Sequence, residues 1–267
     1  MRITGAIESM KNRTKSEFAW MKEIGGDMKL SFPKFFAPLR MDKFVRRYYP
    51  KTAITIAYNY QSRPDFTRSI ANISYSYYWE GNKYFKHAFW PFEINYVQIY
   101  ENRSNKNYLD SMRRTSLGFS FEDHMVSDIR YELEFNSQRL GKSRDYIFTR
   151  INLESSGNLV YVANRILKSD TVDGQYQVLN TPYFQYYKGD IDFRYYNIID
   201  KLNKVIYRIY IGVGYPLGNS RALPFEKKFF AGGPNSVRAW RGFELGPGSY
   251  NEADTNSFFQ YPINKGD

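Results

Sequence analysis

The stretch DIRYELEF, residues 128–135, decides how most of this chain folds. Its apolar residues alternate strictly with charged ones, and they are Ile129, Tyr131, Leu133 and Phe135. Successive side chains of a β-strand point to opposite faces of a sheet, whereas an amphipathic helix needs a period of about 3.6 residues. The stretch therefore predicts a strand with one apolar and one charged face.

The same alternation recurs along the chain and predicts further strands. It is clear at residues 53–60, 72–79 and 205–213, and weaker at 1–8, 27–32, 91–100, 115–121, 146–154 and 183–196. Clusters of Asn, Gly, Pro, Ser and charged residues separate these segments, as expected of turns. Short helices are expected at 38–47 and 158–167. The order predicts an all-β chain, an antiparallel up-and-down meander without an internal linker.

The composition excludes several kinds of functional site. The 267 residues include no cysteine, so disulfide scaffolds, cysteine nucleophiles and cysteine-based zinc sites are excluded. The two histidines, His87 and His124, lie far apart in sequence. A metal-binding interpretation of Glu122, Asp123 and His124 with Asp128 competes with a solvated turn before a strand, and we expect the turn. No P-loop, GxGxxG or nucleophile-elbow motif occurs, so we expect no metal, no cofactor and no enzymatic activity.

The positive charge does not point to a nucleic-acid partner. Lys and Arg number 38 against 27 Asp and Glu, which gives a formal net charge of +11. Basic pairs such as Arg46-Arg47 and Arg113-Arg114 have tyrosines nearby, but the basic residues are scattered over predicted loops and strands alike. We therefore expect no nucleic-acid partner.

Two architectures fit the alternating strands. A soluble β-sandwich buries the apolar faces, whereas an outer-membrane barrel turns them toward lipid and keeps the charged faces in a wet lumen. The chain contains 25 Tyr, 21 Phe and 4 Trp, and the aromatic girdles of membrane barrels use these residue types. The composition thus favours the barrel. Residues 1–20 contain no apolar segment typical of a signal peptide, so the chain is either cytoplasmic or a fragment.

One segment near the C-terminus differs from the meander. It reads FFAGGPNSVRAWRGFELGPGSY, residues 229–250, and its two Gly-rich turns are typical of a loop with a fixed shape. It resembles the loop-six motif of the BamA/TamA outer-membrane assembly superfamily (bacterial surface antigen family), and its Arg-Ala-Trp variant is similar to the TamA-like branch. The matching positions are Phe229, Phe230, Gly232, Gly233, Ser236, Val237, Arg238, Leu245, Gly246 and Pro247, while Ala239 and Trp240 replace the usual glycine and Phe or Tyr.

The resemblance implies a sixteen-stranded transmembrane β-barrel preceded by periplasmic POTRA domains. We expect residues 1–267 to form an incomplete N-terminal portion of that barrel, from the first strands through the sixth extracellular loop at about 214–262, without POTRA domains. A fragment of this kind would explain the missing signal peptide and would place the protein in the bacterial outer membrane.

The resemblance also implies a function in inserting or exporting proteins. In the family the loop folds into the lumen, and its arginine, here Arg238, pairs with acidic groups that lie on strands after the loop. The implied partners are outer-membrane lipid and client outer-membrane or secreted polypeptides. A periplasm-spanning or lipoprotein partner is a further option.

The family mechanism further implies a weak seam between the first and last strands. An unpaired strand edge is a template for another strand, so a barrel that opens there can accept a client strand. We expect this lateral-seam strand at the start of the chain, and its residues are Arg2, Ile3, Thr4, Gly5, Ala6 and Ile7.

Two other functions stay open from the sequence. The first is a passive outer-membrane pore, either a porin or a two-partner secretion transporter with the same loop. The second is a soluble sandwich enzyme or lectin.

Overall fold

The computed structural model describes residues 2–11, 18–36, 49–62, 67–100, 110, 121–139, 144–168, 170–172, 174–200, 202–233 and 236–239. The elements in chain order are β1 (Arg2–Lys11), β2 (Phe18–Phe32), β3 (Lys51–Ser62), β4 (Thr67–Asn82), β5 (Phe85–Tyr100), β6 (His124–Asn136), β7 (Tyr146–Ser156), α3 (Asn158–Ile166), β8 (Thr171–Val172), β9 (Gln175–Val178), β10 (Thr181–Pro182), β11 (Tyr186–Ile198), β12 (Lys204–Pro216) and the 3-10 helix η3 (Phe225–Lys227). Among the helices described, none combines the length and the apolar character needed to cross a membrane.

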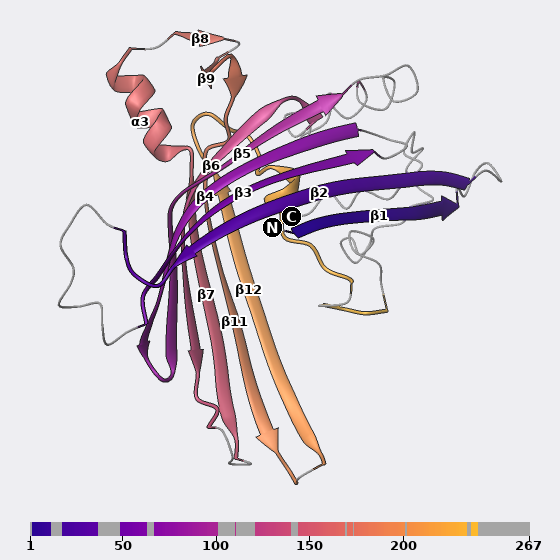
Figure 1. Cartoon of the computed structure of the whole chain (residues 1–267), viewed down its shortest axis with the longest axis vertical. Helices are drawn as coiled ribbons and strands as arrows, with labels where there is room; N and C mark the ends of the chain where they lie inside the picture. Colours follow the sequence, from indigo (N-terminus) through magenta and orange to yellow (C-terminus); the bar gives the residue numbers. More distant parts are fainter. Residues whose placement is uncertain are drawn as a thin grey trace.

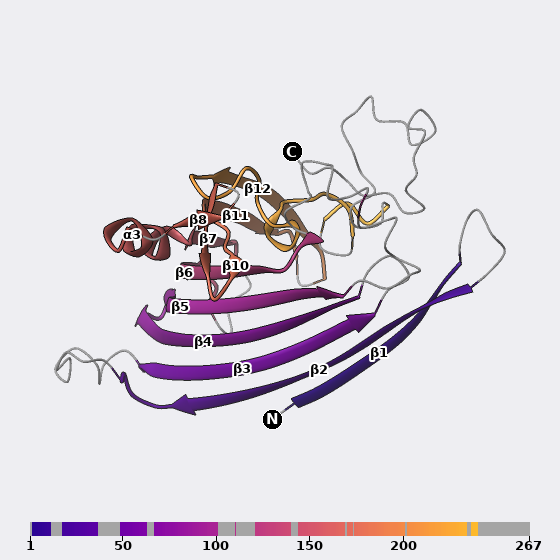
Figure 2. The same ribbon diagram turned by 90° about the horizontal axis from the view of Figure 1, so that it is seen from above.

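Nine strands form one antiparallel sheet in the order β1-β2-β3-β4-β5-β6-β7-β11-β12 (Figure 1). Consecutive strands pair throughout, except that α3 and the small sheet β10-β9-β8 lie between β7 and β11. Figure 2 shows the sheet curled into an arc, with the described residues that follow β12 on the concave side. Within the described ranges, β1 and β12 each pair with one strand, so the barrel is incomplete and unclosed.

The convex face of the sheet is apolar and is bounded by tyrosines. On β12 the outward residues are exposed by 58–66%, and they are Tyr207, Ile209, Ile211, Val213 and Tyr215. At about 3.4 Å per residue, the two tyrosines lie about 27 Å apart along the strand. This spacing matches the apolar band of about 25 Å, flanked by aromatic girdles, that a tilted membrane strand presents to lipid.

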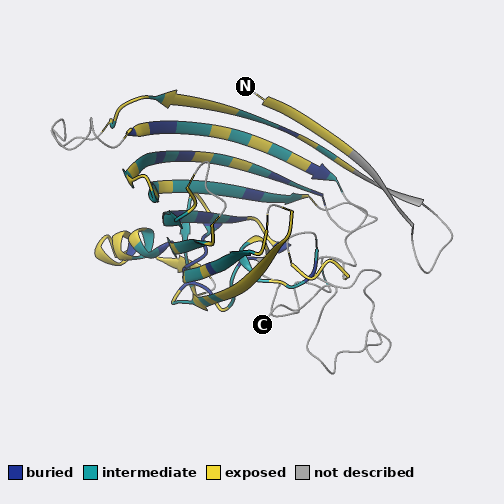
Figure 3. Cartoon of the chain, turned by 90° about the horizontal axis from the view of Figure 1, so that it is seen from below, coloured by how far each residue is buried: buried dark blue, intermediate teal, exposed yellow. Residues whose placement is uncertain are grey.

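The concave face carries the charged residues, which decides between the two architectures. Glu132 and Glu134 on β6 alternate with the apolar residues of the convex face, and Glu134 pairs with Lys86 of β5. On β11 the carboxylate of Asp192 is fully buried on the same face. A β-sandwich would place apolar side chains here to form its core. The structure is therefore an open portion of a transmembrane barrel (Figure 3 shows the alternating burial along the strands).

Most of the predicted elements are confirmed. The clear strand segments 53–60, 72–79, 128–135 and 205–213 lie within β3, β4, β6 and β12, and the helix expected at 158–167 is α3. The weaker segments at 1–8, 27–32, 91–100, 146–154 and 183–196 overlap β1, β2, β5, β7 and β11. The helix expected at 38–47 and the strand expected at 115–121, apart from Phe121, lie outside the described residues.

A proline inside β5 interrupts the pairing of this strand with both neighbours. The register shifts between Trp90 and Glu93 on the β6 side and opposite Tyr75 and Tyr77 on the β4 side. Pro91 lies at this point, and it has no N–H to donate to a sheet hydrogen bond. The strand therefore bulges, while the apolar and charged faces keep their sides of the sheet beyond it.

The two-faced sheet predicts that an arginine destabilises the barrel much more on the outer face of β12 than on its inner face. In the full-length protein Ile211→Arg, at the middle of the outward band, should cost about 2–4 kcal/mol of barrel stability. Ile206→Arg, on the inner face of the same strand, is the matched control and should cost much less. Heat-modifiability on semi-native gels measures folded barrel, and equal losses for the two variants would contradict the assignment of faces.

Candidate functional site

The chain after β12 folds back onto the inner face of that strand. A Cβ atom at Gly212 would lie 2.5 Å from the ring of Phe229, and one at Gly214 would lie 2.5 Å from Leu223. Real Cβ atoms do not approach other heavy atoms so closely, so a larger residue at either of these two inward positions would displace the Phe229 or Leu223 side chain. Phe229 also packs edge-on against Tyr210, with ring centroids 6.1 Å apart.

A lysine of η3 anchors this loop to the inner faces of β6 and β7. Lys227 Nζ lies 2.7 Å from Asp128 Oδ2 on β6 and 2.8 Å from Glu154 Oε1 on β7. The Tyr186 hydroxyl on β11 lies 2.5 Å from Glu154 Oε1 and 3.2 Å from Asp128 Oδ1. The anchor cluster, defined as Lys227, Asp128, Glu154 and Tyr186, thus joins three wall strands to the loop.

Burial makes the anchor cluster sensitive to the loss of any member. Asp128 and Tyr186 are almost completely buried. Burial lowers the pKa of the Lys227 ammonium, but the nearby Asp128 and Glu154 raise it, and the net result is a pKa above the ordinary value. Lys227 is therefore charged at neutral pH. Removing one partner of a buried ion pair costs about 3–5 kcal/mol, because the other charge is left uncompensated.

The neighbouring residue of η3 reaches a different part of the wall. Glu226 Oε1 accepts a hydrogen bond from Arg68 Nη1 on β4 at 2.8 Å. Arg68 Nε also donates to Gln61 on β3 at 3.2 Å. Two consecutive loop residues, Glu226 and Lys227, therefore tie η3 to β4 on one side and to β6 and β7 on the other. The loop is held across the inside of the arc.

A second charged cluster lies on the inner wall beyond the loop. Asp192 on β11 is fully buried and accepts hydrogen bonds of 2.6–3.0 Å from Arg194 and Arg208. Arg150 on β7 lies 3.8 Å from the same carboxylate. Three guanidinium groups therefore converge on one buried carboxylate.

Comparison with known proteins agrees with this geometry. The sequence model of the Omp85 superfamily domain matches residues 7–262. This chain belongs to the Omp85 superfamily. It is therefore a protein of the bacterial outer membrane.

A solved structure shows the same fold. The crystal structure of BamA from Haemophilus ducreyi lacking POTRA domains 1-3 superposes with a TM-score of 0.52 at 10% sequence identity. The match covers 92% of this chain and 47% of that chain, so this chain spans about half the length of that protein. No curated protein matches this chain in sequence.

The loop-six residues predicted in this Omp85 chain fall partly within the described structure. Phe229, Phe230, Gly232, Gly233, Ser236, Val237, Arg238 and Ala239 are described, whereas Trp240, Leu245, Gly246 and Pro247 lie outside the described residues. Gly232 and Gly233 have φ angles of 94° and 86°, which favour glycine. The Ser236 N–H donates to the Gly233 carbonyl at 3.2 Å, which closes a turn. Arg238 is exposed, and its pairing in the lumen stays a prediction.

The predicted seam residues lie on an edge strand. Arg2, Ile3, Thr4, Gly5, Ala6 and Ile7 belong to β1, which pairs with β2. Residues 2–6 are exposed. The role of these residues in a seam stays a prediction.

Glu122 and Asp123 form the expected exposed turn before β6, whereas His124 and Asp128 are buried. His124 opens β6 and is fully buried, with Nδ1 2.8 Å from the Glu122 carbonyl and its ring packed edge-on against Phe184. Asp123 accepts a hydrogen bond from the Ile99 N–H. Asp128 belongs to the anchor cluster. In the part of the chain that the structure describes, no group of three or more His, Cys, Asp or Glu could hold a metal ion.

Neither the anchor cluster nor the packing of the loop against Gly212 and Gly214 was predicted from the sequence. Lys227 and Asp128 are 99 residues apart in the sequence. The alternation of charged residues in β6 does not indicate which carboxylate contacts the loop. The signal that existed was Gly212 and Gly214, two glycines on one face of a strand otherwise rich in β-branched and aromatic residues. Such glycines indicate a close approach of another segment.

The anchor cluster predicts a stability effect specific to Lys227. In the full-length protein Lys227→Met should destabilise the folded barrel by about 3–5 kcal/mol, because Asp128 and Glu154 lose their buried counter-charge. Lys228→Met, one residue along and half-buried, is the control and should have a small effect. The double variant Lys227→Met, Asp128→Asn should recover part of the loss, measured by thermal unfolding on semi-native gels. Equal effects of the two single Met variants would rule out the cluster as an anchor.

Proposed function

We propose that the full-length protein inserts or exports other polypeptides at the outer membrane, with the loop after β12 held inside its barrel. The observation that carries this proposal is the tie from Lys227 to Asp128 and Glu154 across the inner face. A loop fixed across the lumen obstructs free diffusion, which an open pore requires. The lumen is therefore not the proposed route for the client.

The proposed route is a lateral seam between the first and last strands of the closed barrel. Backbone N–H and C=O groups on a strand edge need partners in lipid, and an incoming client strand can supply them by β-augmentation. This function makes and breaks no covalent bond, so the protein is proposed as non-enzymatic. Its proposed partners are lipid, client polypeptides and a periplasm-spanning or lipoprotein subunit, and POTRA domains are proposed elsewhere in the full-length protein.

Strand order gives two competing positions for the seam. In an up-and-down barrel that begins on the periplasmic side, the sixth extracellular loop follows the eleventh strand. The loop that carries the motif here follows β12, the ninth strand of the sheet. If it is the sixth loop, β1 is the third strand and the seam lies elsewhere. If β1 with Arg2–Ile7 is the seam strand, the loop is the fifth. Because ten motif residues support the loop, we favour the first assignment.

Cross-linking from β1 separates these assignments. With photo-reactive residues at Thr4 and Ala6 of the full-length protein, we expect adducts within the barrel and none with a nascent client. Ser74 on the central strand β4 is the control position and should give no client adduct in either case. Client adducts confined to Thr4 and Ala6 would instead identify β1 as the seam strand and contradict the sixth-loop assignment.

The predicted lumen role of Arg238 gives a functional test. Arg238→Ala should lower client insertion by about tenfold or more in a reconstituted assay, since loss of a charged hydrogen-bonded partner in a low-dielectric site costs at least about 1.5 kcal/mol. Arg221→Ala, an exposed arginine of the same loop, is the matched control. Wild-type insertion by Arg238→Ala would contradict the role, and a steady single-channel conductance without insertion activity would favour a passive pore.

A further inference from the structure

Helix α3 presents its polar side to its own loop and its apolar side outward. Asn164 Nδ2 donates to the Tyr183 hydroxyl at 3.3 Å, and both residues are buried. Asn158 Nδ2 donates to Ser155 Oγ at 2.9 Å, and Gln185 Nε2 donates to Asn158 Oδ1 at 3.0 Å. The hydrogen bonds that fix the helix therefore all lie on its polar side.

The opposite side of α3 is a continuous apolar surface. Its members, which we call the apolar arc, are Leu159, Val162, Ala163, Ile166 and Leu167, the last being the residue after the helix. Leu159, Val162, Ile166 and Leu167 are 68%, 53%, 74% and 75% exposed. At about 100° per residue, these five positions cover about 140° of the helix surface. A helix in water normally buries such a face, so the apolar arc points to a second surface.

The location of α3 shows which surface this is. Figure 2 places α3 beyond the end of β7, on the convex side of the arc, and therefore outside the barrel wall. The helix begins two residues after β7 ends at Ser156. The strand ends at this level carry Tyr187 and Tyr215 on the outer face, exposed by 54% and 65%. The apolar arc thus starts at the aromatic girdle where the barrel wall leaves the membrane.

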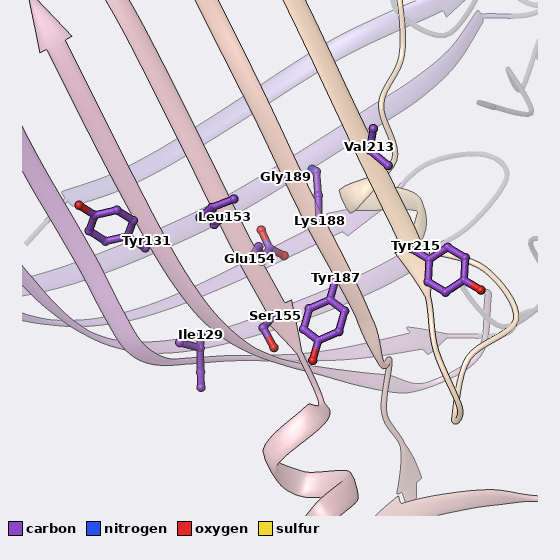
Figure 4. Close-up of a pocket in the computed structure, with 10 residues that line it drawn as sticks. All are labelled: Ile129, Tyr131, Leu153, Glu154, Ser155, Tyr187, Lys188, Gly189, Val213 and Tyr215. Carbon is purple, nitrogen blue, oxygen red and sulfur yellow. The ribbon is translucent and has the colours of Figure 1, made fainter.

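The outer wall below α3 contains an apolar hollow that continues this surface. Its volume is about 470 Å³, and its lining includes Ile129, Leu153, Tyr187 and Val213 (Figure 4). Gly189 pairs with Leu153 on one side and Val213 on the other, so the hollow arises where an outward side chain is absent. A hollow of this kind on a lipid-facing wall fits an acyl chain.

We propose that α3 lies in the membrane interface and binds the lipid surface beside the barrel. The apolar arc enters the acyl region, and a lipid chain occupies the hollow at Gly189. Lys168, exposed just after the helix ends at Ile166, matches an anionic headgroup. Amphipathic helices with this division of residues lie in the plane of the interface, with the apolar face about 5–10 Å below the headgroup boundary.

Site-directed spin labelling of the full-length protein tests this proposal. The chain contains no cysteine, so single substitutions Leu159→Cys, Val162→Cys and Ile166→Cys place labels on the apolar arc. Arg165→Cys, exposed on the same helix but outside the apolar arc, is the control. Each variant is reconstituted in vesicles of phosphatidylethanolamine and phosphatidylglycerol, and its heat-modifiability is compared with that of the parent. Collision rates with oxygen and with a water-soluble nickel chelate are then measured by power saturation.

The oxygen-to-nickel collision ratio should be several-fold higher at the three arc positions than at Arg165→Cys, since oxygen concentrates in the acyl region. Equal ratios at the arc and control positions would mean that the arc faces water and would overturn the proposal. Low collision rates with both reagents at the arc would mean that protein covers it, either a second copy or another subunit, and would overturn it as well. Three separate arc positions keep the test decisive if one variant fails to fold.

Discussion

The fold of this Omp85 chain depends on the need to pair every backbone N–H and C=O group inside the membrane. An antiparallel sheet of long strands meets that need by joining each strand to its neighbours, and complete pairing requires closure into a barrel. The two-residue period of a strand then fixes the chemistry of the two faces. On β12 the residues that face outward are Tyr207, Ile209, Ile211, Val213 and Tyr215. The charged side chains of the sheet lie on the inner face. The charged lumen is thus a consequence of the membrane wall.

A charged inner wall in turn determines how the loop after β12 is held. Phe229 packs against the backbone at Gly212, and Leu223 packs against the backbone at Gly214. The directional contacts are ionic, from Lys227 to Asp128 and Glu154 and from Glu226 to Arg68. The attraction within these ion pairs is stronger in the lumen than it would be in bulk water, because the surrounding wall reduces the screening of the charges. The same polar wall that follows from the membrane environment therefore supplies the partners that keep the loop inside.

The strands of the sheet could be predicted from the sequence, whereas the anchor cluster could not. Alternation in segments such as 128–135 and 205–213 is a local property, so strand positions and faces could be predicted from it. The positive φ angles of Gly232 and Gly233 agree with the shaped loop inferred from their composition. The pairing of Lys227 with Asp128 depends on the curvature of the whole sheet and on the path of the loop, which no local pattern encodes. The burial of His124 was missed for the same reason, since Phe184 covers it from a distant segment.

The central claim is that the loop after β12 sits on the inner wall in the native protein. A short bifunctional thiol reagent applied to the Lys227→Cys, Asp128→Cys double variant in outer membranes tests it most directly. The account predicts an intramolecular cross-link that changes migration on denaturing gels, and none for the pair Lys227→Cys, Asp145→Cys, because Asp145 lies at the turn before β7, at the far end of that strand. Full thiol labelling at both Lys227→Cys and Asp128→Cys without a cross-link would contradict it.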